Sequence, residues 1–414
     1  MTASRQCQNA AVTTSVGPDD VVAARAILAP MVRRTPLLES SALSALVGGP
    51  VYLKCENLQR GGSFKVRGAY VRIARLTAAE RARGVVAASA GNHAQGVALA
   101  AEALGAAVTV VMPAAAPLPK VAATRSYGAE VVLHGATVED ALARAQELAA
   151  EAGSIFIHPF DHPDVIAGQG TVGLEIAEQC PLVRTIAVPV GGGGLAAGIA
   201  VAIGAALPEA RLVGVQAEAV APVRASVAAG HPVSVQSAAT MADGIAVARP
   251  GDLPIALLAA ARPDLVTVTE ENLSRGLLLC LERAKQVVEP AGAAGVGAIL
   301  EHPGVFQPPV VIVLSGGNID PLLLSKVLRH GLSAAGRFLA FRCKLPDRPG
   351  ALATLLTELA DLGANVLDVV HERVTPDLRV DEAEVSLHLE TRGPEHTDSV
   401  VSQLRKAGYT LGFS

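Results

Sequence analysis

Short apolar runs alternate with longer alanine-rich segments along most of this chain. The runs cover residues 85–88, 108–111, 131–133 and 155–157, and after Pro181 they resume at 186–190, 212–215, 266–268 and 310–314. Apolar runs without polar alternation, separated by helical segments, are typical of parallel strands that are buried on both faces and joined by crossover helices. The pattern therefore predicts an α/β protein with two parallel-sheet halves.

The character of the chain changes after Arg329. Residues 337–414 hold 21 of the 72 charged residues in only 78 of the 414 positions, which indicates more surface and a smaller core. Their pattern predicts a strand at 338–345, a helix at 350–362, strands at 365–374 and 383–390, a helix at 395–407 and a strand at 409–413. This βαββαβ order is the ferredoxin-like arrangement, so we expect a main part at residues 1–336 and a separate domain at 337–414.

Composition narrows the classes of partner. A formal net charge of -4 and the lack of a basic cluster argue against nucleic acid and anionic membranes. Residues 185–208 carry no charge, but Pro189 and four consecutive glycines divide them into a strand and a helix, each too short to cross a bilayer. We therefore expect a small-molecule ligand, with no nucleic-acid or membrane partner.

The cysteines and the amino terminus indicate the cellular compartment of the protein. The five cysteines are far apart and form no pair at zinc-ligand spacing: Cys7, Cys55, Cys180, Cys280 and Cys343. Residues 1–17 lack the continuous apolar segment of a signal peptide. We expect reduced, mostly buried thiols and a cytoplasmic protein.

One lysine is the centre of the candidate chemistry. Lys65 follows a glycine pair, between a predicted strand at residues 51–54 and an amphipathic run at 69–76. A lysine where a loop enters a helix can bind an aldehyde cofactor. The more ordinary interpretation is an exposed first-turn lysine, with Arg67 on the same exposed face. The other glycine-marked loops of the chain favour the cofactor.

Three further loops with glycine follow predicted strands. They are Ser-Ala-Gly-Asn-His-Ala-Gln-Gly at residues 89–96, Pro-Val-Gly-Gly-Gly-Gly-Leu at 189–195 and Ser-Gly-Gly-Asn at 315–318. The carboxyl ends of the strands share one rim in an open α/β sheet, so these loops are expected to converge with Lys65. The glycines at 191–194 would let backbone N–H groups approach a phosphate before a helix that begins near Leu195. A flexible turn is the alternative.

The loop at residues 89–96 suits a different anion. A hydroxyl at Ser89, an amide at Asn92 and nearby backbone N–H groups can receive a carboxylate. His93 could act as a general base, although a hydrogen-bonded core histidine is the more ordinary interpretation.

Taken in order, these segments resemble the pyridoxal-phosphate enzymes of the tryptophan-synthase-β fold type, and most closely the threonine dehydratases. Further matching segments lie at residues 34–37, 165–171 and 240–244, and the turn at 347–352 resembles the start of an ACT domain, an amino-acid-sensing module. The resemblance implies a two-domain α/β fold with pyridoxal 5'-phosphate in the cleft between the halves. The smaller half, about residues 60–155, would be inserted in the larger, and an ACT domain would follow.

The resemblance also implies roles for individual residues. Lys65 would bind the cofactor and then act as the base, and Ser315 would meet the pyridine nitrogen. The implied cofactor contacts are Phe64, Lys65, Asn92, Gly191, Gly192, Gly193, Gly194, Leu195 and Ser315. The implied substrate contacts are Ser89, Gly91, Asn92 and His93. Glu289 matches a position near the cofactor and has no assigned role.

The activity implied by the resemblance is conversion of L-threonine to 2-oxobutanoate and ammonia, with L-serine giving pyruvate, at the start of isoleucine biosynthesis. Serine dehydratase, serine racemase, threonine synthase and cysteine synthase are alternatives, as is a silent amino-acid sensor. Ala90 stands where racemases carry a serine as second base. Glu218 matches one acid of the racemases' cation site, but residues 219–224 leave the site incomplete, so no metal is expected. We also expect a homo-oligomer, dimer or tetramer, and an amino-acid effector, isoleucine first, at the C-terminal domain.

Overall fold

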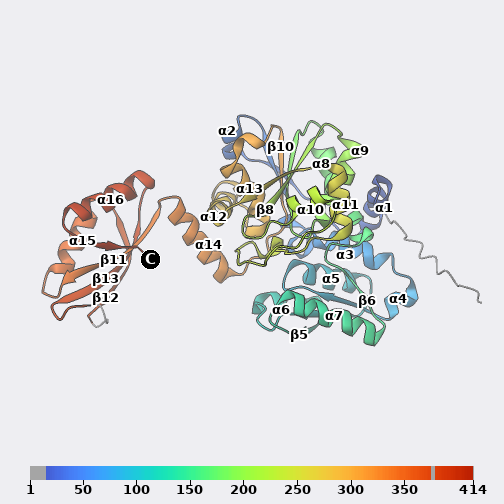
Figure 1. Cartoon of the computed structure of the whole chain (residues 1–414), viewed down its shortest axis with the longest axis horizontal. Coiled ribbons are helices and arrows are strands. Elements are labelled where there is room, and N and C mark those ends of the chain that lie inside the picture. Colours follow the sequence, from blue (N-terminus) through green and yellow to red (C-terminus); the bar gives the residue numbers. More distant parts are fainter. Residues whose placement is uncertain (1–14, 374–377, 414) are drawn as a thin grey trace, which may run out of the picture. The chain divides into compact units, whose positions relative to one another are not determined.

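The computed structural model describes residues 15–373 and 378–413. The chain divides into two compact units, residues 1–276 with 280–320, and residues 277–279 with 321–414 (Figure 1). Helix α14 (Pro321–Ala334) groups with the second unit, so the boundary predicted at residue 336 stays a prediction. Most of the amino-terminal segment, including Cys7, lies outside the described residues.

Six strands form the larger sheet of the first unit, in the order β1-β2-β10-β7-β8-β9. Their bounds are β1 Leu37–Glu39, β2 Val51–Cys55, β7 Thr185–Pro189, β8 Arg211–Ala217, β9 Asp264–Val268 and β10 Val310–Leu314. All neighbours pair in parallel except β1, which is antiparallel to β2. The apolar runs of the sequence thus form the predicted parallel strands. The sequence did not reveal β1, because it has three residues and none is buried.

Nine helices accompany this sheet within the described part of the first unit or at its edge. They are α1 Pro18–Leu28, α2 Ser41–Val47, α3 Lys65–Ala74, α8 Pro163–Gln179, α9 Gly194–Ala206, α10 Val223–Ala229, α11 Asp252–Ala261, α12 Glu270–Leu279 and α13 Pro290–Glu301. Helices α8 and α9 approach closely because both carry glycine. A Cβ added at Gly198 would lie 2.3 Å from the carbonyl oxygen of Ile166. This contact fixes α9, which follows the glycine loop.

The smaller sheet of the first unit has four parallel strands in the order β5-β4-β3-β6. Its strands are β3 Val85–Ala88, β4 Val108–Met112, β5 Glu130–Leu133 and β6 Ile155–Phe156, and its helices are α4 Ala78–Ala82, α5 Asn92–Ala103, α6 Leu118–Ser126 and α7 Val138–Ala152. Figure 1 shows α5, α6 and α7 gathered around this sheet. The second parallel half predicted from the apolar runs is thereby confirmed.

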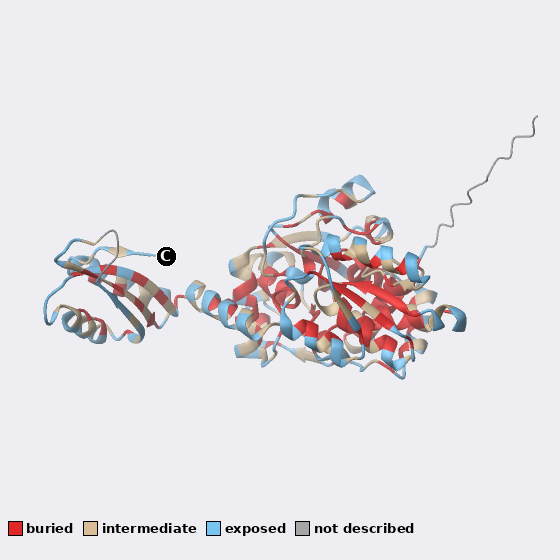
Figure 2. Ribbon diagram, turned by 90° about the horizontal axis from the view of Figure 1, so that it is seen from below, coloured by how far each residue is buried: buried red, intermediate tan, exposed pale blue. Residues whose placement is uncertain are grey.

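The uncharged stretch at residues 185–208 forms strand β7 and helix α9, as predicted. Within the described ranges, no helix has the length and apolar character needed to cross a membrane. Figure 2 shows that buried residues concentrate in the central strands of the first unit, whereas exposed residues lie on the outer faces of its helices.

Four charged side chains form a buried ionic network that includes Arg67 of α3. The Arg67 guanidinium contacts Glu56 at 2.8 Å and Glu175 at 2.7 Å, and Lys54 contacts Glu175 at 2.5 Å. Arg67 and Lys54 are wholly buried. The interpretation of Arg67 as an exposed neighbour of Lys65 is therefore wrong. Two positive and two negative charges balance each other, which is what burial of such groups requires.

The second unit has an antiparallel four-stranded sheet in the order β12-β13-β11-β14. Its elements are α14, β11 Phe338–Pro346, α15 Ala351–Asp361, β12 Asn365–Glu372, β13 Glu382–Glu390, α16 Pro394–Lys406 and β14 Leu411–Gly412. The predicted βαββαβ order is confirmed. The end predicted for the β12 strand, residue 374, lies outside the described residues. Alternate residues of β11 and β13 are buried against α15 and α16 and form a core separate from that of the first unit.

Candidate active site

A cavity of about 500 Å³ opens in the first unit where strands of both sheets end. Every residue predicted for the site lines it: Phe64, Lys65, Ser89, Gly91, Asn92, His93, Gly191, Gly192, Gly193, Gly194, Leu195 and Ser315. The predicted convergence of the four loops is thus confirmed. The roles assigned to the individual residues stay predictions.

Backbone and side-chain hydrogen bonds join three of these loops. The Phe64 N–H donates to the carbonyl oxygen of Ser315 at 3.2 Å. The Asn318 amide donates to the Gly61 carbonyl at 2.7 Å and to the Asn92 side-chain oxygen at 2.8 Å. The loop before Lys65, the loop at Asn92 and the loop after β10 therefore form one connected rim.

Lys65 is the first residue of α3, as the sequence indicated. Its Nζ donates to the carbonyl oxygen of Pro159 at 3.0 Å, and a Cβ added at Gly96 of α5 would lie 3.0 Å from the Lys65 carbonyl carbon. Protein surrounds the amine, although the side chain keeps some contact with the cavity. Burial lowers the pKa of Lys65 to about 8, against the opposing pull of the Glu289 carboxylate. The amine can therefore lose its proton near neutral pH, which a nucleophile or base requires.

Asn92 is held from two sides. It donates from Nδ2 to Glu289 Oε1 at 2.5 Å while its oxygen accepts from Asn318. Burial raises the pKa of Glu289 to about 7, and the nearby Asp243 adds to the shift. Glu289 was given no role from sequence, yet it orients Asn92 and exchanges its proton in the neutral range.

His93 faces the core as well as the cavity. Its side chain is 3% exposed, and its Nε2 donates to the carbonyl oxygen of Ile157 at 2.9 Å. Burial, and then the charge of Lys65, lower the pKa of His93 to about 3. A histidine that stays neutral and donates to the backbone has the arrangement of a core histidine rather than of a base.

The glycine loop has the form of an anion site. Gly193 adopts a φ of 94°, which side chains rarely tolerate, and a Cβ at Gly192 would lie 2.3 Å from the ring of Phe160. Within the described residues, the N–H groups of 191–193 have no acceptor, and α9 begins directly after them. Free N–H groups at a helix N-terminus bind phosphate.

The donor set of the cavity fits pyridoxal phosphate. Lys65 offers an amine for an aldehyde, the loop at 191–194 offers N–H groups for a phosphate, and the buried hydroxyl of Ser315 can meet a ring nitrogen. Gln169 Oε1 also lies at the cavity, buried and without a partner among the described residues. An unsatisfied buried acceptor indicates a place where a polar ligand belongs.

Several cavity residues were missed from sequence. Pro159 and Phe160 contact Lys65 and the glycine loop, yet they follow β6 in a segment without glycine signals. Lys120 of α6 forms an ion pair with Asp243 at 3.0 Å. No local pattern links two residues 123 positions apart, so only the tertiary fold could reveal this pair.

Potential metal ligands and thiols both occur within the described ranges of the chain. The described residues contain no group of three or more His, Cys, Asp or Glu side chains that could hold a metal ion. The four cysteines that the structure describes are free and buried: Cys55, Cys180, Cys280 and Cys343.

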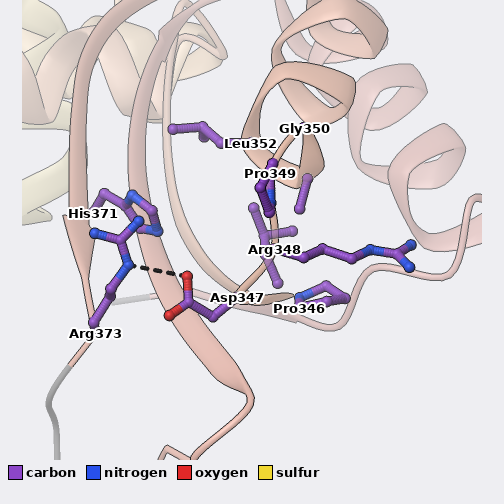
Figure 3. A pocket seen from close by; sticks show the side chains of 10 residues that line it. Pro346, Asp347, Arg348, Pro349, Gly350, Leu352, His371 and Arg373 are labelled. Carbon is purple, nitrogen blue, oxygen red and sulfur yellow. Dashed lines mark hydrogen bonds and ion pairs between the residues drawn. The ribbon is translucent and has the colours of Figure 1, made fainter.

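The second unit has a cavity of its own, of about 340 Å³. The turn at residues 345–352 lines it together with His371 and Arg373 of the segment at β12. Figure 3 shows Arg373 reaching Asp347, and the two form an ion pair at 3.0 Å. The turn singled out from the sequence thus borders a small polar cavity.

Family models match both units. Residues 28–316 match the model described as "Pyridoxal-phosphate dependent enzyme", and residues 340–408 match the ACT domain. Over 393 residues the chain is 47% identical to the L-threonine ammonia-lyase of Thermotoga maritima, a match that covers 95% of this chain and 98% of that protein.

Solved structures show the same similarity for the first unit. A threonine deaminase of T.th. is 42% identical, with a TM-score of 0.70, over 73% of this chain and 99% of that one. Maize serine racemase is 34% identical, with a TM-score of 0.72, over 77% and 98%. The predicted fold is confirmed by these matches, while the two names leave two reactions to be distinguished.

Proposed function

The chain belongs to the pyridoxal-phosphate dependent enzyme family and carries an ACT domain, and from this premise we propose that it converts L-threonine into 2-oxobutanoate and ammonia. One observation carries the proposal: the similarity to an L-threonine ammonia-lyase extends over both units. The shared cavity of Lys65 and the other residues predicted for the site supports it.

Each loop has a part in this chemistry. Pyridoxal phosphate, when bound, supplies an electron sink that makes the α-proton of an amino acid removable. Lys65 would hold the aldehyde and, as a free amine, would be placed to take the proton from the substrate Cα. The N–H groups of 191–194 would hold the phosphate. Leu195 and Phe64, which line the same cavity, would lie beside the phosphate and the ring. Asn92, which is oriented by Glu289 and Asn318, would face the ring oxygen.

Ser315 favours elimination. The Ser315 hydroxyl would meet the ring nitrogen, which it cannot keep protonated as a carboxylate would. Less charge would then be withdrawn into the ring, and this would favour loss of the β-hydroxyl, as water once it is protonated, over transamination. The loop with Ser89, Gly91 and His93 receives the substrate carboxylate. L-serine has the same β-hydroxyl and gives pyruvate.

Serine racemization is the second candidate, because maize serine racemase has this fold at 34% identity. A racemase must return a proton to the opposite face of Cα. Ala90 lines the cavity where the racemases carry a serine, and a methyl group cannot carry a proton. With L-serine we expect pyruvate without appreciable D-serine. Formation of D-serine as fast as pyruvate would show that a second base does reach the opposite face of Cα.

The ACT domain supports regulation by a small ligand. We propose an amino acid, isoleucine first and valine in opposition, at the cavity beside residues 347–352. An effector changes activity only if it binds one conformational state better than another, and such coupling is typically about 1 to 3 kcal/mol. We further propose a dimer or tetramer in the cytoplasm, at the start of isoleucine biosynthesis.

The test is keto-acid release by the pyridoxal-phosphate-loaded protein. L-threonine should give 2-oxobutanoate and equimolar ammonia, and isoleucine should lower the apparent affinity for L-threonine. A colourless protein that binds amino acids without releasing keto acid would instead be a sensor without catalysis.

A further inference from the structure

Lys120 is a buried cation that the proposed chemistry leaves without a role. Its side chain is 10% exposed and lines the cavity from α6 of the smaller half. Its Nζ lies 3.0 Å from Asp243 Oδ2, which comes from the larger half. A Cβ added at Gly91 would lie 3.6 Å from the same Nζ. The ammonium therefore stands directly beside the loop at residues 89–92.

That loop lacks a positive charge of its own. Residues 89–92 are Ser-Ala-Gly-Asn. The hydroxyl of Ser89 already accepts the Gly91 N–H at 3.1 Å, and the amide of Asn92 is engaged by Glu289. Neutral groups alone stabilise a carboxylate less than a charge-assisted hydrogen bond does. A nearby ammonium supplies the missing charge.

We propose that Lys120 positions the substrate by binding its carboxylate at the loop of residues 89–92, and that it leaves Asp243 to do so. The inference rests on the function proposed above and names a binding residue within it. Lys120 would exchange one carboxylate for another, so the buried ammonium would never be left unpaired.

The unequal exposure of the pair favours this exchange. The side chain of Asp243 is 55% exposed, whereas that of Lys120 is 10% exposed. Once released, Asp243 can be hydrated at little cost, but a buried Lys120 without a partner would be costly. Asp243 thus holds Lys120 until an amino acid arrives and competes with it for the ammonium.

Two substitutions that break the same ion pair distinguish this exchange from an ion pair that only joins the two halves of the first unit. If the pair only joined the two halves, Lys120→Met and Asp243→Asn would have the same effect. Under the proposal the effects are opposite, because the first removes the group that binds the carboxylate and the second removes its competitor.

The experiment is an equilibrium titration of the holoenzyme, followed by its absorbance spectrum. L-alanine is the probe because it lacks a β-hydroxyl to lose, and L-alaninamide is the matched probe without a carboxylate. Lys120→Met should lower the affinity for L-alanine at least about 10-fold, equal to about 1.4 kcal/mol. It should change the affinity for L-alaninamide less than about 2-fold. Asp243→Asn should raise the affinity for L-alanine. Lys120→Arg keeps a positive charge and should retain most of the preference for L-alanine over L-alaninamide.

Arg211→Met is the control, since it breaks an ion pair with Asp264 whose partners are 41% and 48% exposed. It should leave both titrations unchanged. If Lys120→Met and Asp243→Asn weakened the binding of both probes equally, the ion pair would only join the two halves, and the proposal would be overturned. An unchanged affinity of Lys120→Met for L-alanine would also overturn it. Turnover of L-threonine by the unaltered protein is measured separately, so a failure of the proposed reaction is not confused with a failure of the Lys120 assignment.

Discussion

Each unit has a cavity lined by described residues, and the two cavities differ in how far the charged groups around them are buried. In the first unit, Lys65 and Glu289 are enclosed, and burial moves their pKa values to about 8 and about 7. In the second unit, Asp347 and Arg373 form an ion pair whose side chains are 34% and 62% exposed. Burial turns a binding cavity into one that can move protons at neutral pH. The ion pair of the second cavity lacks this burial, which agrees with the proposal that the second unit binds an effector.

The same contrast applies to the ion pairs that support the two cavities. Arg67 lies two residues after Lys65 and is held by Glu56 and Glu175 inside the protein. The pair of Asp347 and Arg373 lies at the surface. We therefore expect the first unit to depend on its charges for both catalysis and stability, and the second unit to depend on its own charges for little of its stability.

The largest effect should follow from Lys65→Ala. Removing the amine removes both the attachment of the cofactor and the base, so keto-acid release should fall at least about 10³-fold, and the yellow colour should be lost. The far-ultraviolet circular dichroism should stay the same. Lys406→Ala, an exposed lysine of the second unit, is the matched control and should retain full activity. Substantial turnover by Lys65→Ala would contradict the claim that the first cavity is catalytic because of its buried lysine.

The supporting ion pairs should differ in their contribution to stability. Arg67→Met leaves two buried carboxylates short of a partner and should lower the free energy of unfolding of the first unit by about 3 to 5 kcal/mol. Arg373→Met breaks an exposed pair and should cost the second unit less than about 1 kcal/mol. Denaturant titration of each transition measures both values. Comparable losses from the two substitutions would contradict the contrast.

Glu289 should make stability depend on pH. Its pKa is raised in the folded state from 4.5 to about 7, so its contribution is full below pH 4.5 and is lost as the pH rises through 7. The stability of the cofactor-free protein relative to Glu289→Gln should therefore fall by roughly 2 to 3 kcal/mol between pH 5 and pH 8. Denaturant unfolding at several pH values measures this difference. Parallel pH curves for the two proteins would show that Glu289 does not titrate as assigned.

Removal of the second unit should change regulation and leave catalysis unchanged. A chain that ends at Gly336 should keep its turnover of L-threonine and lose the response to isoleucine, which is a change of about 5- to 150-fold in apparent affinity. Asp347→Ala in the full chain should weaken the same response, since Asp347 lines the cavity. Undiminished inhibition of the shortened chain by isoleucine would move the effector site to the first unit.

The sequence predicted what local patterns encode. Uniformly apolar runs identified the parallel strands, and the shared rim of strand ends explains why Lys65, Asn92, the glycine loop and Ser315 could be expected together. The turn at residues 347–352 was singled out by its resemblance to the start of an ACT domain, and it lines the second cavity. These features depend on neighbours within a few positions of the chain.

Contacts between distant segments could not be predicted. Arg67 has the local pattern of a surface residue, and its burial depends on Glu175, which lies 108 positions away. The pairing of Lys120 with Asp243 likewise requires α6 of one half to meet the segment after residue 240 of the other. The burial of such charged groups can be recognised only when the fold shows which oppositely charged partners lie beside them.

The attachment of the cofactor is the most direct test of the account. The purified holoenzyme is treated with borohydride, which fixes the cofactor covalently to the amine that holds it, and its peptides are mapped by mass spectrometry. We predict a pyridoxyl group on the peptide that contains Lys65, in stoichiometric amount. A pyridoxyl group on Lys54 or Lys120 instead, or on no lysine of the first unit, would contradict the central role of Lys65.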